Sequence, residues 1–512
     1  MDWTSALAHS PWGLLLLATA LALSSFALHG RQGINLADEG FLWYGVQRTM
    51  AGELPLLDFQ AYDPGRYYWC ALGAFIYGKG LVALRFSENL FQIIGLWVGL
   101  LIATRMTNDG LLIAAIGVVL LLWMFPSFKL FDHSSLLVGI WIAVRLIEEP
   151  SLSRTFIAGA FVGFSVFFGR NHALYNLLAQ SALLLVLKLK LSELLLFPQL
   201  GVWIAGIAIG LVPMIAVCLC RTGVAASYLD SILSILRNGT NLPLPIPWPW
   251  RVSPFKNTGS SSQFLLGLFL IALPLVYLIG IVVALVGQRE TIQDHSVLIG
   301  SSFVGLFYLH HAFSRADISH LAQAIHPFLL GILALSCSFG ESKFYPWSAI
   351  AILVTTARLT VSKQSSRYLR FTSAVPWEPF DAGGIIFVPQ RINRLLTCLR
   401  KFASENFSPH ESILIAPSSP ALYPILNLKA PCWDLAFYFP AAEPVQEKII
   451  QNLKMENVNW VILSDTTTNQ RENMRFSTTH AFLAEHLKIE FEPVKSVDLP
   501  ESTTILRRKR AS

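Results

Sequence analysis

The sequence predicts a polytopic α-helical membrane protein with a soluble α/β domain at its C-terminus. The composition and the pattern of apolar stretches lead to this prediction. Of the 512 residues, 54% are hydrophobic and only 14% are charged, and the mean hydropathy is +0.53. An ordinary soluble domain has roughly 25% charged residues. The composition therefore excludes a soluble enzyme over most of the chain.

Apolar stretches that are long enough, or nearly long enough, to cross a bilayer recur between residues 11 and 360. Because backbone groups in lipid must be satisfied within the segment, each crossing takes roughly 20 apolar residues in a helix. We predict about eleven transmembrane helices, near residues 11–29, 86–104, 110–126, 134–147, 156–169, 173–187, 197–219, 263–286, 296–311, 321–340 and 345–360. The first has neither a basic stretch before it nor a cleavage site after it, so we expect a retained helix.

The sequence pattern changes after about residue 365. Short β-branched or apolar runs alternate there with helical patterns such as residues 444–455, which predicts a water-soluble α/β domain. The runs lie at residues 384–388, 412–416, 460–463 and 503–506. We therefore assign residues 1–362 to a transmembrane domain with a first outer loop at 30–66, and residues 363–512 to a soluble domain. An odd number of crossings places that domain on the side opposite the N-terminus.

The charge distribution limits the partners. Lys and Arg number 38 against 32 Asp and Glu, a net charge of +6. These basic residues are dispersed, whereas a nucleic-acid binder gathers them on one face, so phosphate-bearing lipids are the better candidates. The short loops on the predicted N-terminal side carry fewer Lys and Arg than those opposite, the reverse of the positive-inside pattern. Either the topology is inverted or these residues bind anions, and we favour the second.

The first polar loop carries an acidic pair, Asp38 and Glu39, followed by an amphipathic run at residues 41–50 that is expected to lie on the membrane surface. A second motif at residues 63–69 contains Arg66 and three aromatic residues. An acidic residue at the mouth of a transmembrane helix is a candidate general base. Equally, Asp38 is a favourable N-cap for the surface helix.

Two further groups of ionisable residues border apolar stretches. Asp132 and His133 follow the third stretch, and ionisable residues at membrane depth are costly and usually functional. The alternative is that Asp132 or Ser134 caps the fourth helix. Arg170 and His172 lie between two stretches without an acidic neighbour in sequence, so the guanidinium needs a carboxylate or a ligand phosphate from elsewhere.

The segment 310–321 is the richest in polar residues. It holds His310, His311, Arg315, Asp317 and His320 at the end of an apolar stretch. Zinc ligation by three of these residues is one interpretation, but no paired spacing such as HExxH is present, and we assign no metal ligand. A phosphate clamp is favoured, because Arg binds phosphate oxygens bidentately and His adds donors. An internal ion pair between Arg315 and Asp317 that closes a turn is the third interpretation.

Together these motifs resemble the GT-C class of membrane glycosyltransferases, and more narrowly the bacterial relatives of protein O-mannosyltransferases and of the lipid A aminoarabinose transferases. The resemblance covers nearly the whole chain. It is carried by Asn35–Gly40, Asp63–Trp69 with Gly78 and Arg85 after it, Phe131–His133, Ser314–Leu321 and Ile413–Tyr423.

The resemblance implies roles for individual residues. Asp38 takes the place of the catalytic acidic residue of the first loop, with Glu39 beside it, and Asp132 takes the place of the second acidic residue. The family transfers a sugar from a polyprenyl phosphate on the outer face of the membrane, which implies a bacterial inner membrane with the C-terminal domain in the periplasm. The aminoarabinose transferases usually have a Pro near the second acidic residue, and this chain has Asp-His-Ser-Ser, which argues against the same substrate.

These observations lead to a specific expectation of function. We expect inverting transfer of a sugar to an acceptor hydroxyl, with Asp38 as the base. Arg66, Arg170 and Arg315 are expected to stabilise the departing phosphate. The other expected substrate-binding residues are His133, His172, His311, Asp317 and His320. No cofactor is firmly implied, and the help of a divalent cation is left open.

A transporter or flippase of a polyprenyl-linked sugar is the alternative. It would use the same cations around a cavity at the membrane midplane, and internal repeats of the helix pattern would be its sign. We find no such repeat in the sequence.

Overall fold

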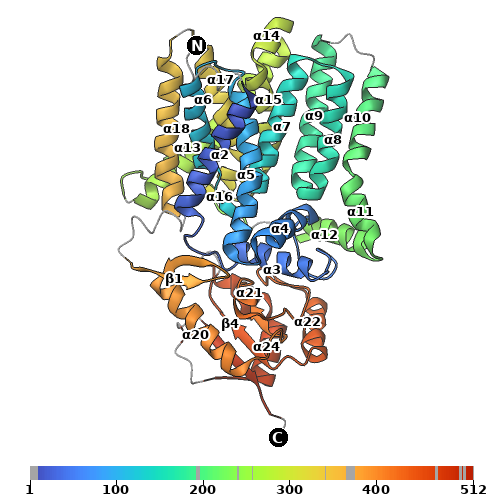
Figure 1. Ribbon diagram of the computed structural model, residues 1–512, viewed down its shortest axis with the longest axis vertical. Helices are drawn as coiled ribbons and strands as arrows, with labels where there is room; N and C mark the ends of the chain where they lie inside the picture. Colours follow the sequence, from blue (N-terminus) through green and yellow to red (C-terminus); the bar gives the residue numbers. More distant parts are fainter. Residues whose placement is uncertain are drawn as a thin grey trace. The chain divides into compact units, whose positions relative to one another are not determined.

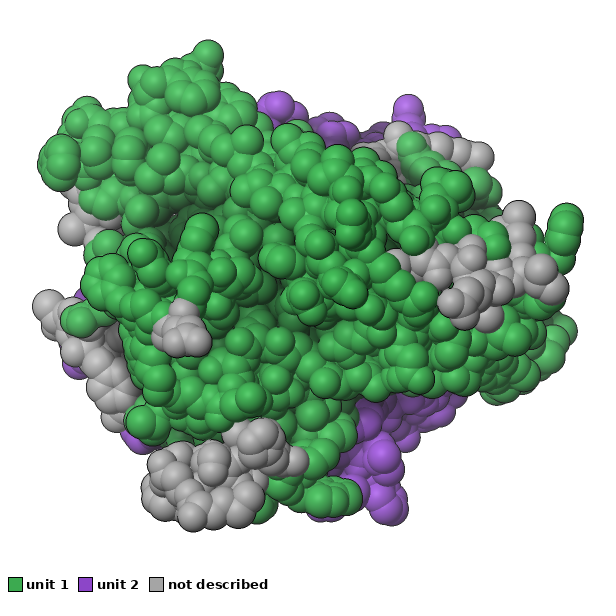
Figure 2. All heavy atoms as spheres, turned by 90° about the horizontal axis from the view of Figure 1, so that it is seen from above, with its two compact units in different colours: residues 1–30, 85–371 green, residues 31–84, 372–512 purple. Residues whose placement is uncertain are grey.

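The computed structural model describes residues 10–191, 196–238, 242–256, 258–340, 342–364, 375–467, 471–494, 499 and 503–510. The chain divides into two compact units, which Figure 2 colours separately. Unit 1 comprises Met1–Gly30 and Arg85–Phe371, and unit 2 comprises Arg31–Leu84 and Thr372–Ser512. The chain thus leaves unit 1 after Gly30 and returns to it at Arg85.

Unit 1 is helical throughout its described part (Figure 1). Each of the apolar stretches predicted from the sequence falls on a helix or a bent pair of helices. The elements are α2 (Pro11–His29), α5 (Leu81–Ala103, whose first residues belong to unit 2), α6 (Gly110–Trp123), η1 (Ser127–Lys129), α7 (Leu130–Glu148), α8 (Leu152–Phe168), α9 (Arg170–Leu191), α10 (Leu196–Gly210), α11 (Val212–Cys220), α12 (Val224–Asn238), η2 (Pro249–Arg251), α13 (Thr258–Val286), α14 (Arg289–Asp294), α15 (Ser296–Ser314), α16 (Ile318–Ala324), α17 (His326–Ser338) and α18 (Phe344–Gln364).

The number of helices that can cross a membrane is smaller than the number predicted. Among the described residues, 6 helices are long and apolar enough, or up to 8 if each bent pair is one span. Two of the predicted stretches correspond to shorter apolar helices, α6 and α8. The chain is therefore a polytopic helical membrane protein, and the count of eleven spans stays a prediction.

Proline explains why two predicted stretches are bent pairs of helices. The stretch at 197–219 is divided between α10 and α11, which meet at 40°, and the stretch at 321–340 between α16 and α17, which meet at 58°. Pro213 and Pro327 occupy the first turns of α11 and α17. Proline lacks the N–H that would continue the preceding helix and is favourable at a helix start, so the chain breaks there.

Unit 2 is a mixed α/β structure. Its helices are α3 (Asp38–Met50), α4 (Pro64–Tyr77), α20 (Gln390–Asn406), α21 (Leu422–Leu426), α22 (Glu443–Met455), η3 (Glu472–Met474), α23 (Phe476–Thr479) and α24 (Ala481–Glu490). Its strands are β1 (Trp377–Asp381), β2 (Ile385–Pro389), β3 (Leu414–Ala416), β4 (Trp460–Leu463), β5 (Phe491–Pro493) and β6 (Thr504–Arg508). The predicted α/β character after residue 365 is confirmed.

The strands of unit 2 form two sheets. β1 and β2 make an antiparallel hairpin, and the other sheet has the order β3-β4-β6-β5. In the second sheet β3 pairs with β4 in parallel, with Leu414 opposite Val461, and the remaining pairs are antiparallel. The four predicted runs correspond to β2, β3, β4 and β6, whereas the sequence analysis missed β1 and β5.

Residues 31–84 pack with the C-terminal part of the chain inside unit 2. The backbone N–H of Gly33 donates to the carbonyl of Phe387 at 2.8 Å, and the N–H of Phe387 donates to the carbonyl of Arg31 at 2.7 Å. The hydroxyl of Tyr44 accepts the backbone N–H of Ala430 at 3.0 Å. The first loop and the C-terminal residues are therefore one folding unit, while the domain boundary at residues 362/363 stays a prediction.

One of the close backbone contacts inside unit 2 is between Gly40 and Ala421. A Cβ atom on Gly40 would lie 2.3 Å from the backbone nitrogen of Ala421, and that N–H donates to the carbonyl of Leu36 at 3.1 Å. Only glycine permits this approach, because the opposing atoms are backbone and cannot rotate away.

Replacing Gly40 is expected to destabilise unit 2. We expect Gly40→Val to lower the free energy of unfolding by at least about 1–3 kcal/mol, the usual cost of overpacking. Thermal unfolding of the purified protein measures this. The control is Gly201→Ala in α10, where an added Cβ meets nothing within 4 Å, and where stability is expected to be unchanged or slightly higher. Equal midpoints for Gly40→Val and wild type would contradict the close packing.

Candidate functional site

The candidate residues of unit 1 gather at one end of its helices. The helices α5 to α9 are joined by short connections, so consecutive helices run in opposite directions (Figure 1). The starts of α5, α7 and α9 therefore lie at the same end. Asp132 is in the first turn of α7, and His172 is in the first turn of α9. Arg85 donates to the carbonyl of Gly30 at 2.9 Å, so the chain leaves and re-enters unit 1 at this end.

Asp132, His172 and Tyr308 form a hydrogen-bonded chain between three helices. Asp132 Oδ1 lies 2.5 Å from His172 Nε2, and His172 Nδ1 lies 2.6 Å from the hydroxyl of Tyr308 in α15. Asp132 and His172 are each 6% exposed and Tyr308 is 1% exposed. The alternative that Asp132 caps α7 is wrong, because it lies inside the helix and Lys129 is at the N-cap position.

A second tyrosine extends this group of polar residues. The hydroxyl of Tyr175 lies 2.9 Å from His310 Nδ1, and the rings of Tyr175 and Tyr308 are 4.7 Å apart. Sequence analysis missed both tyrosines. A signal for Tyr175 was present, because it lies one helical turn after His172 and therefore on the same face of α9. Tyr308 sits inside an apolar stretch, where nothing in the sequence marks its partner.

Arg315, Asp317 and His320 are bound together through one carboxylate. Asp317 Oδ2 accepts from Arg315 Nε at 2.6 Å, and Asp317 Oδ1 accepts from the backbone N–H of His320 at 2.9 Å and lies 2.9 Å from its Nδ1. Asp317 is the N-cap of α16. The ion pair considered from the sequence is thus formed, and Arg315 also donates to the carbonyl of Leu242 at 3.2 Å.

The electrostatics of Asp317 follow from these contacts. Burial raises the pKa of Asp317, but the hydrogen bonds and charge of His320 and the hydrogen bond from Arg315 lower it more, so that the pKa falls from 3.8 to about 2. The ring of His311 lies 5.2 Å from that of His320, nearly parallel to it. The segment 311–320 is therefore a linked group of imidazole, guanidinium and carboxylate side chains.

His133 and Arg170 have other surroundings. The side chain of His133 is fully buried, and its ring lies 5.2 Å from the ring of His326. Arg170 Nη1 donates to the hydroxyl of Ser231 at 2.5 Å, and its Cζ lies 4.8 Å from the ring centroid of Tyr228. Within the described part of the chain, no three His, Cys, Asp or Glu side chains are placed to hold a metal ion.

Unit 2 holds the acidic pair of the first loop. The side-chain oxygen of Asn35 accepts the backbone N–H groups of Ala37 at 3.0 Å and of Asp38 at 2.9 Å, and Glu39 Oε2 accepts the backbone N–H of Asn35 at 3.2 Å. The side chains of Asn35 and Glu39 therefore accept backbone N–H groups at the start of α3 that have no partner within the helix, as in a capping box. The interpretation of Asp38 as the cap is wrong.

The two carboxylates of the pair differ in exposure. Glu39 is 2% exposed, whereas Asp38 is exposed and approaches the side-chain amide of Asn35 at 3.5 Å. Arg66, in the first turn of α4, is 6% exposed, and its Cζ lies 5.4 Å from the ring centroid of Tyr62. The structure thus places Asp38, Glu39 and Arg66 in unit 2 and the other candidate residues in unit 1.

Unit 1 also contains a polar pocket at the end where the candidates gather. Its empty volume is about 550 Å³, including space open to solvent. The polar side chains that line it are Ser25, His29, Arg85, Asn89, Gln92 and Ser127. Arg85, Asn89 and Gln92 come from α5, where a spacing of three, four and seven residues puts them on one face. Sequence analysis noted Arg85 alone among them.

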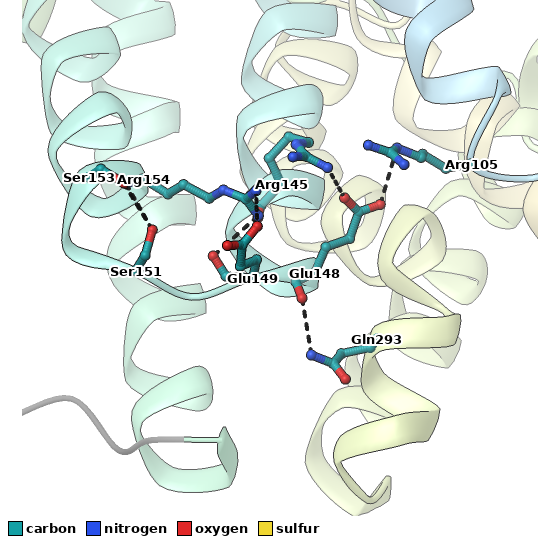
Figure 3. A network of polar contacts seen from close by, with 8 residues as sticks. All are labelled: Arg105, Arg145, Glu148, Glu149, Ser151, Ser153, Arg154 and Gln293. Atoms are coloured by element: carbon teal, nitrogen blue, oxygen red, sulfur yellow. Dashed lines mark hydrogen bonds and ion pairs between the residues drawn. The ribbon is translucent and has the colours of Figure 1, made fainter. Parts of the chain in front are cut away.

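The opposite end of unit 1 carries a network of ion pairs (Figure 3). Glu148 lies between Arg145, at 2.6 Å, and Arg105, at 3.3 Å, and Glu149 pairs with Arg154. These residues follow α5, end α7 and begin α8. Two glutamates pair here with three arginines, so this end is held together by interactions within the chain.

Comparison with known proteins finds a likeness only among solved structures. No protein-family model matches the chain, and no curated protein matches it. The crystal structure of ArnT from Cupriavidus metallidurans bound to undecaprenyl phosphate is similar to it with a TM-score of 0.49 and 12% identity, over 97% of this chain and 98% of that one. The structure of ArnT in the apo state gives a TM-score of 0.47 and 12% identity, over 96% and 97%.

The ion pairs of Glu148 are expected to contribute stability without affecting the candidate site. We expect Glu148→Gln to lower the free energy of unfolding by about 1–2 kcal/mol, because two arginines lose a charged partner at a partly exposed position. Thermal unfolding measures the change. Glu290→Gln, at an exposed acid of α14, is the matched control. A Glu148→Gln protein as stable as this control would contradict the network.

The Asp317 contacts predict a pH dependence of stability. The pKa of this carboxyl in the folded protein is lowered, so the stability it contributes is present above its ordinary pKa and is lost as the pH falls from about 4 towards 2. We expect wild type to be more stable than Asp317→Asn from pH 7 to pH 5, with a constant difference that shrinks below about pH 4. Denaturant unfolding followed by tryptophan fluorescence measures the difference. Its loss already at pH 6 would contradict the assignment.

Proposed function

We propose that this chain is a membrane glycosyltransferase that moves a sugar from a polyprenyl-phosphate donor to an acceptor hydroxyl at the outer face of the membrane, with inversion. The observation that carries the proposal is the state of the acidic pair in the first loop. Glu39 is buried and accepts the backbone N–H of Asn35. Asp38 beside it is exposed, and its backbone N–H donates to the side chain of Asn35. A carboxylate with a fixed backbone and a side chain accessible to solvent is suited to contact a substrate.

Sugar transfer to a hydroxyl requires a carboxylate or another base near the acceptor. As the acceptor oxygen attacks the anomeric carbon, its proton must pass to a base within hydrogen-bond reach. Asp38 is assigned this role, because Asn35 fixes the backbone at Asp38 and the helix continues from it without a break. The carboxylate is therefore preorganised relative to unit 2, which reduces the entropy lost in reaching the reactive geometry.

The departing polyprenyl phosphate needs positive charge and donors. Arg315 is suited to this role, because the hydrogen bond from its Nε to Asp317 fixes the orientation of the guanidinium. Arg170 rests on the ring of Tyr228 and Arg66 on the ring of Tyr62, contacts that orient a guanidinium without removing its charge. Donors fixed in advance stabilise the charge that develops in the transition state.

The helices beside the other candidates agree with a lipid-linked donor, because α7, α9 and α15 are each long and apolar enough to cross a membrane. The polar residues at the ends of α7, α9 and α15 lie next to apolar helices, so a phosphate at this level would keep its polyprenyl chain in lipid. The resemblance of the motifs to GT-C enzymes supports the same substrate class. The proposal places the enzyme in a bacterial inner membrane.

The proposal is tested by turnover of the purified protein in nanodiscs with radiolabelled polyprenyl-phosphate sugars, with and without Mg²⁺. We expect Asp38→Asn to lose roughly a hundredfold or more in rate, because general base catalysis contributes about 10²–10⁴-fold, while donor binding is kept. Glu447→Gln, at an exposed carboxylate of α22, is expected to match wild type.

Two results would contradict the proposal. Normal turnover by Asp38→Asn would remove the assigned base. Tight donor binding by wild type without loss of label from any donor would instead favour the transporter or flippase.

A further inference from the structure

We propose that Tyr308 and His172 are positioning residues for Asp132, in a relay where the hydroxyl of Tyr308 donates to Nδ1 of a neutral His172 and Nε2–H of His172 donates to an ionised Asp132. The geometry that carries it is the pair of contacts at 2.6 Å and 2.5 Å. The role of the relay in transfer rests on the proposed function, and the hydrogen-bond arrangement does not.

The direction of the hydrogen bonds follows from the proposed states of the three groups, an ionised Asp132 and a neutral His172. An ionised carboxylate only accepts, so the contact at Asp132 Oδ1 requires the proton on His172 Nε2. A neutral imidazole has one N–H, so Nδ1 is then an acceptor. The hydroxyl of Tyr308 must therefore point its hydrogen at Nδ1. A doubly protonated His172 would reverse the last bond and make Tyr308 the acceptor.

The surroundings hold the imidazole in this place. The ring of His172 stacks on that of Tyr308 at 5.6 Å with an interplanar angle of 27°, and the side chain of Tyr175 packs on Tyr308 from the same helix as His172. The side-chain amide of Asn176 donates to the carbonyl of His172 at 2.8 Å. Both the ring and the backbone of His172 are thus fixed.

The relay explains how an ionised carboxylate is tolerated in the first turn of a membrane helix. An isolated charge at this depth is costly, and a charge-assisted hydrogen bond offsets part of that cost. Donation by Tyr308 polarises the imidazole, which makes Nε2–H a better donor to Asp132. Tyr308 therefore acts on Asp132 through His172, without contacting the substrate itself.

Magnetic resonance tests the arrangement without any assay of activity. The protein is labelled with ¹⁵N-histidine in nanodiscs, and the signals of His172 are identified by their loss in His172→Gln. We expect the proton on Nε2 and a hydrogen-bonded, unprotonated Nδ1. In Tyr308→Phe, the Nδ1 signal is expected to move to the position of a nitrogen without a hydrogen bond. A proton on Nδ1, a doubly protonated ring, or identical spectra of wild type and Tyr308→Phe would overturn the relay.

Turnover tests the positioning role. We expect Tyr308→Phe to lower kcat by about tenfold to a hundredfold, the usual effect of removing the partner that orients a functional group, with an unchanged KM for the donor. Tyr277→Phe is the matched control, because Tyr277 is a buried tyrosine of α13 outside the relay. We expect it to retain the wild-type kcat.

The two proposals fail in different ways. A wild-type kcat in Tyr308→Phe overturns the positioning role, even where sugar transfer is observed. The expected spectra without turnover of any donor overturn the proposed function and leave the hydrogen-bond arrangement in place.

Discussion

The hydrogen bond between Asp132 and His172 is the interaction on which the polar end of unit 1 depends. It joins α7 to α9, and the hydrogen bond between His172 and Tyr308 joins α9 to α15. In lipid, helices gain little from burying apolar side chains against each other, so polar contacts between helices decide which faces meet.

Once Asp132 and His172 are paired, the end of α15 must lie at the start of α9, and this brings His310 to Tyr175. The segment 311–320 then follows at the same end. One buried carboxylate thus has consequences for three helices and the residues after them.

In unit 2 the corresponding constraint is contact between backbones. Gly40 lies against Ala421, and the N–H of Ala421 donates to the carbonyl of Leu36. Ala421 and Tyr423, at the end of the stretch Ile413–Tyr423, are therefore part of the surface on which the first loop packs. The ring of Tyr423 also lies 4.8 Å from that of Tyr44 in α3. The C-terminal residues thus determine the conformation of the backbone that presents Asp38, even though none of them is itself a candidate catalytic residue.

Sequence patterns were sufficient where a single segment determines its own structure. The apolar stretches located the helices, and four of the strands were found because their β-branched runs are short and bounded. The strands β1 and β5 were missed because Trp377–Asp381 and Phe491–Pro493 contain Pro and acidic residues. The bends before Pro213 and Pro327 were missed because the apolar pattern continues through them. Asp132 was recognised as costly at membrane depth and His172 as a candidate between two apolar stretches, but their pairing depends on which helices are neighbours, and no spacing in the sequence encodes that. The start of α3 was considered only for Asp38, as an alternative to its role as base, and the contacts of Asn35 were missed, since either residue type suits a helix start.

The Arg315 and Asp317 pair shows that a structural and a functional interpretation of the same residues can both hold. Asp317 accepts from Nε of Arg315 and, as the N-cap of α16, from the backbone N–H of His320 in the first turn of that helix. The two side chains lose hydration when they pair at this partly buried position, and this desolvation offsets much of their electrostatic attraction. The pair is therefore expected to add little to the free energy of unfolding.

Fixing the orientation of the guanidinium is a better physical reason for the pair. A free arginine side chain samples many rotamers, and each must be restricted before the guanidinium can face a phosphate. With Nε held by Asp317 and Nη1 by the carbonyl of Leu242, that restriction is already present in the folded chain. The ion pair that closes the turn is therefore also the means by which a phosphate clamp would be preorganised.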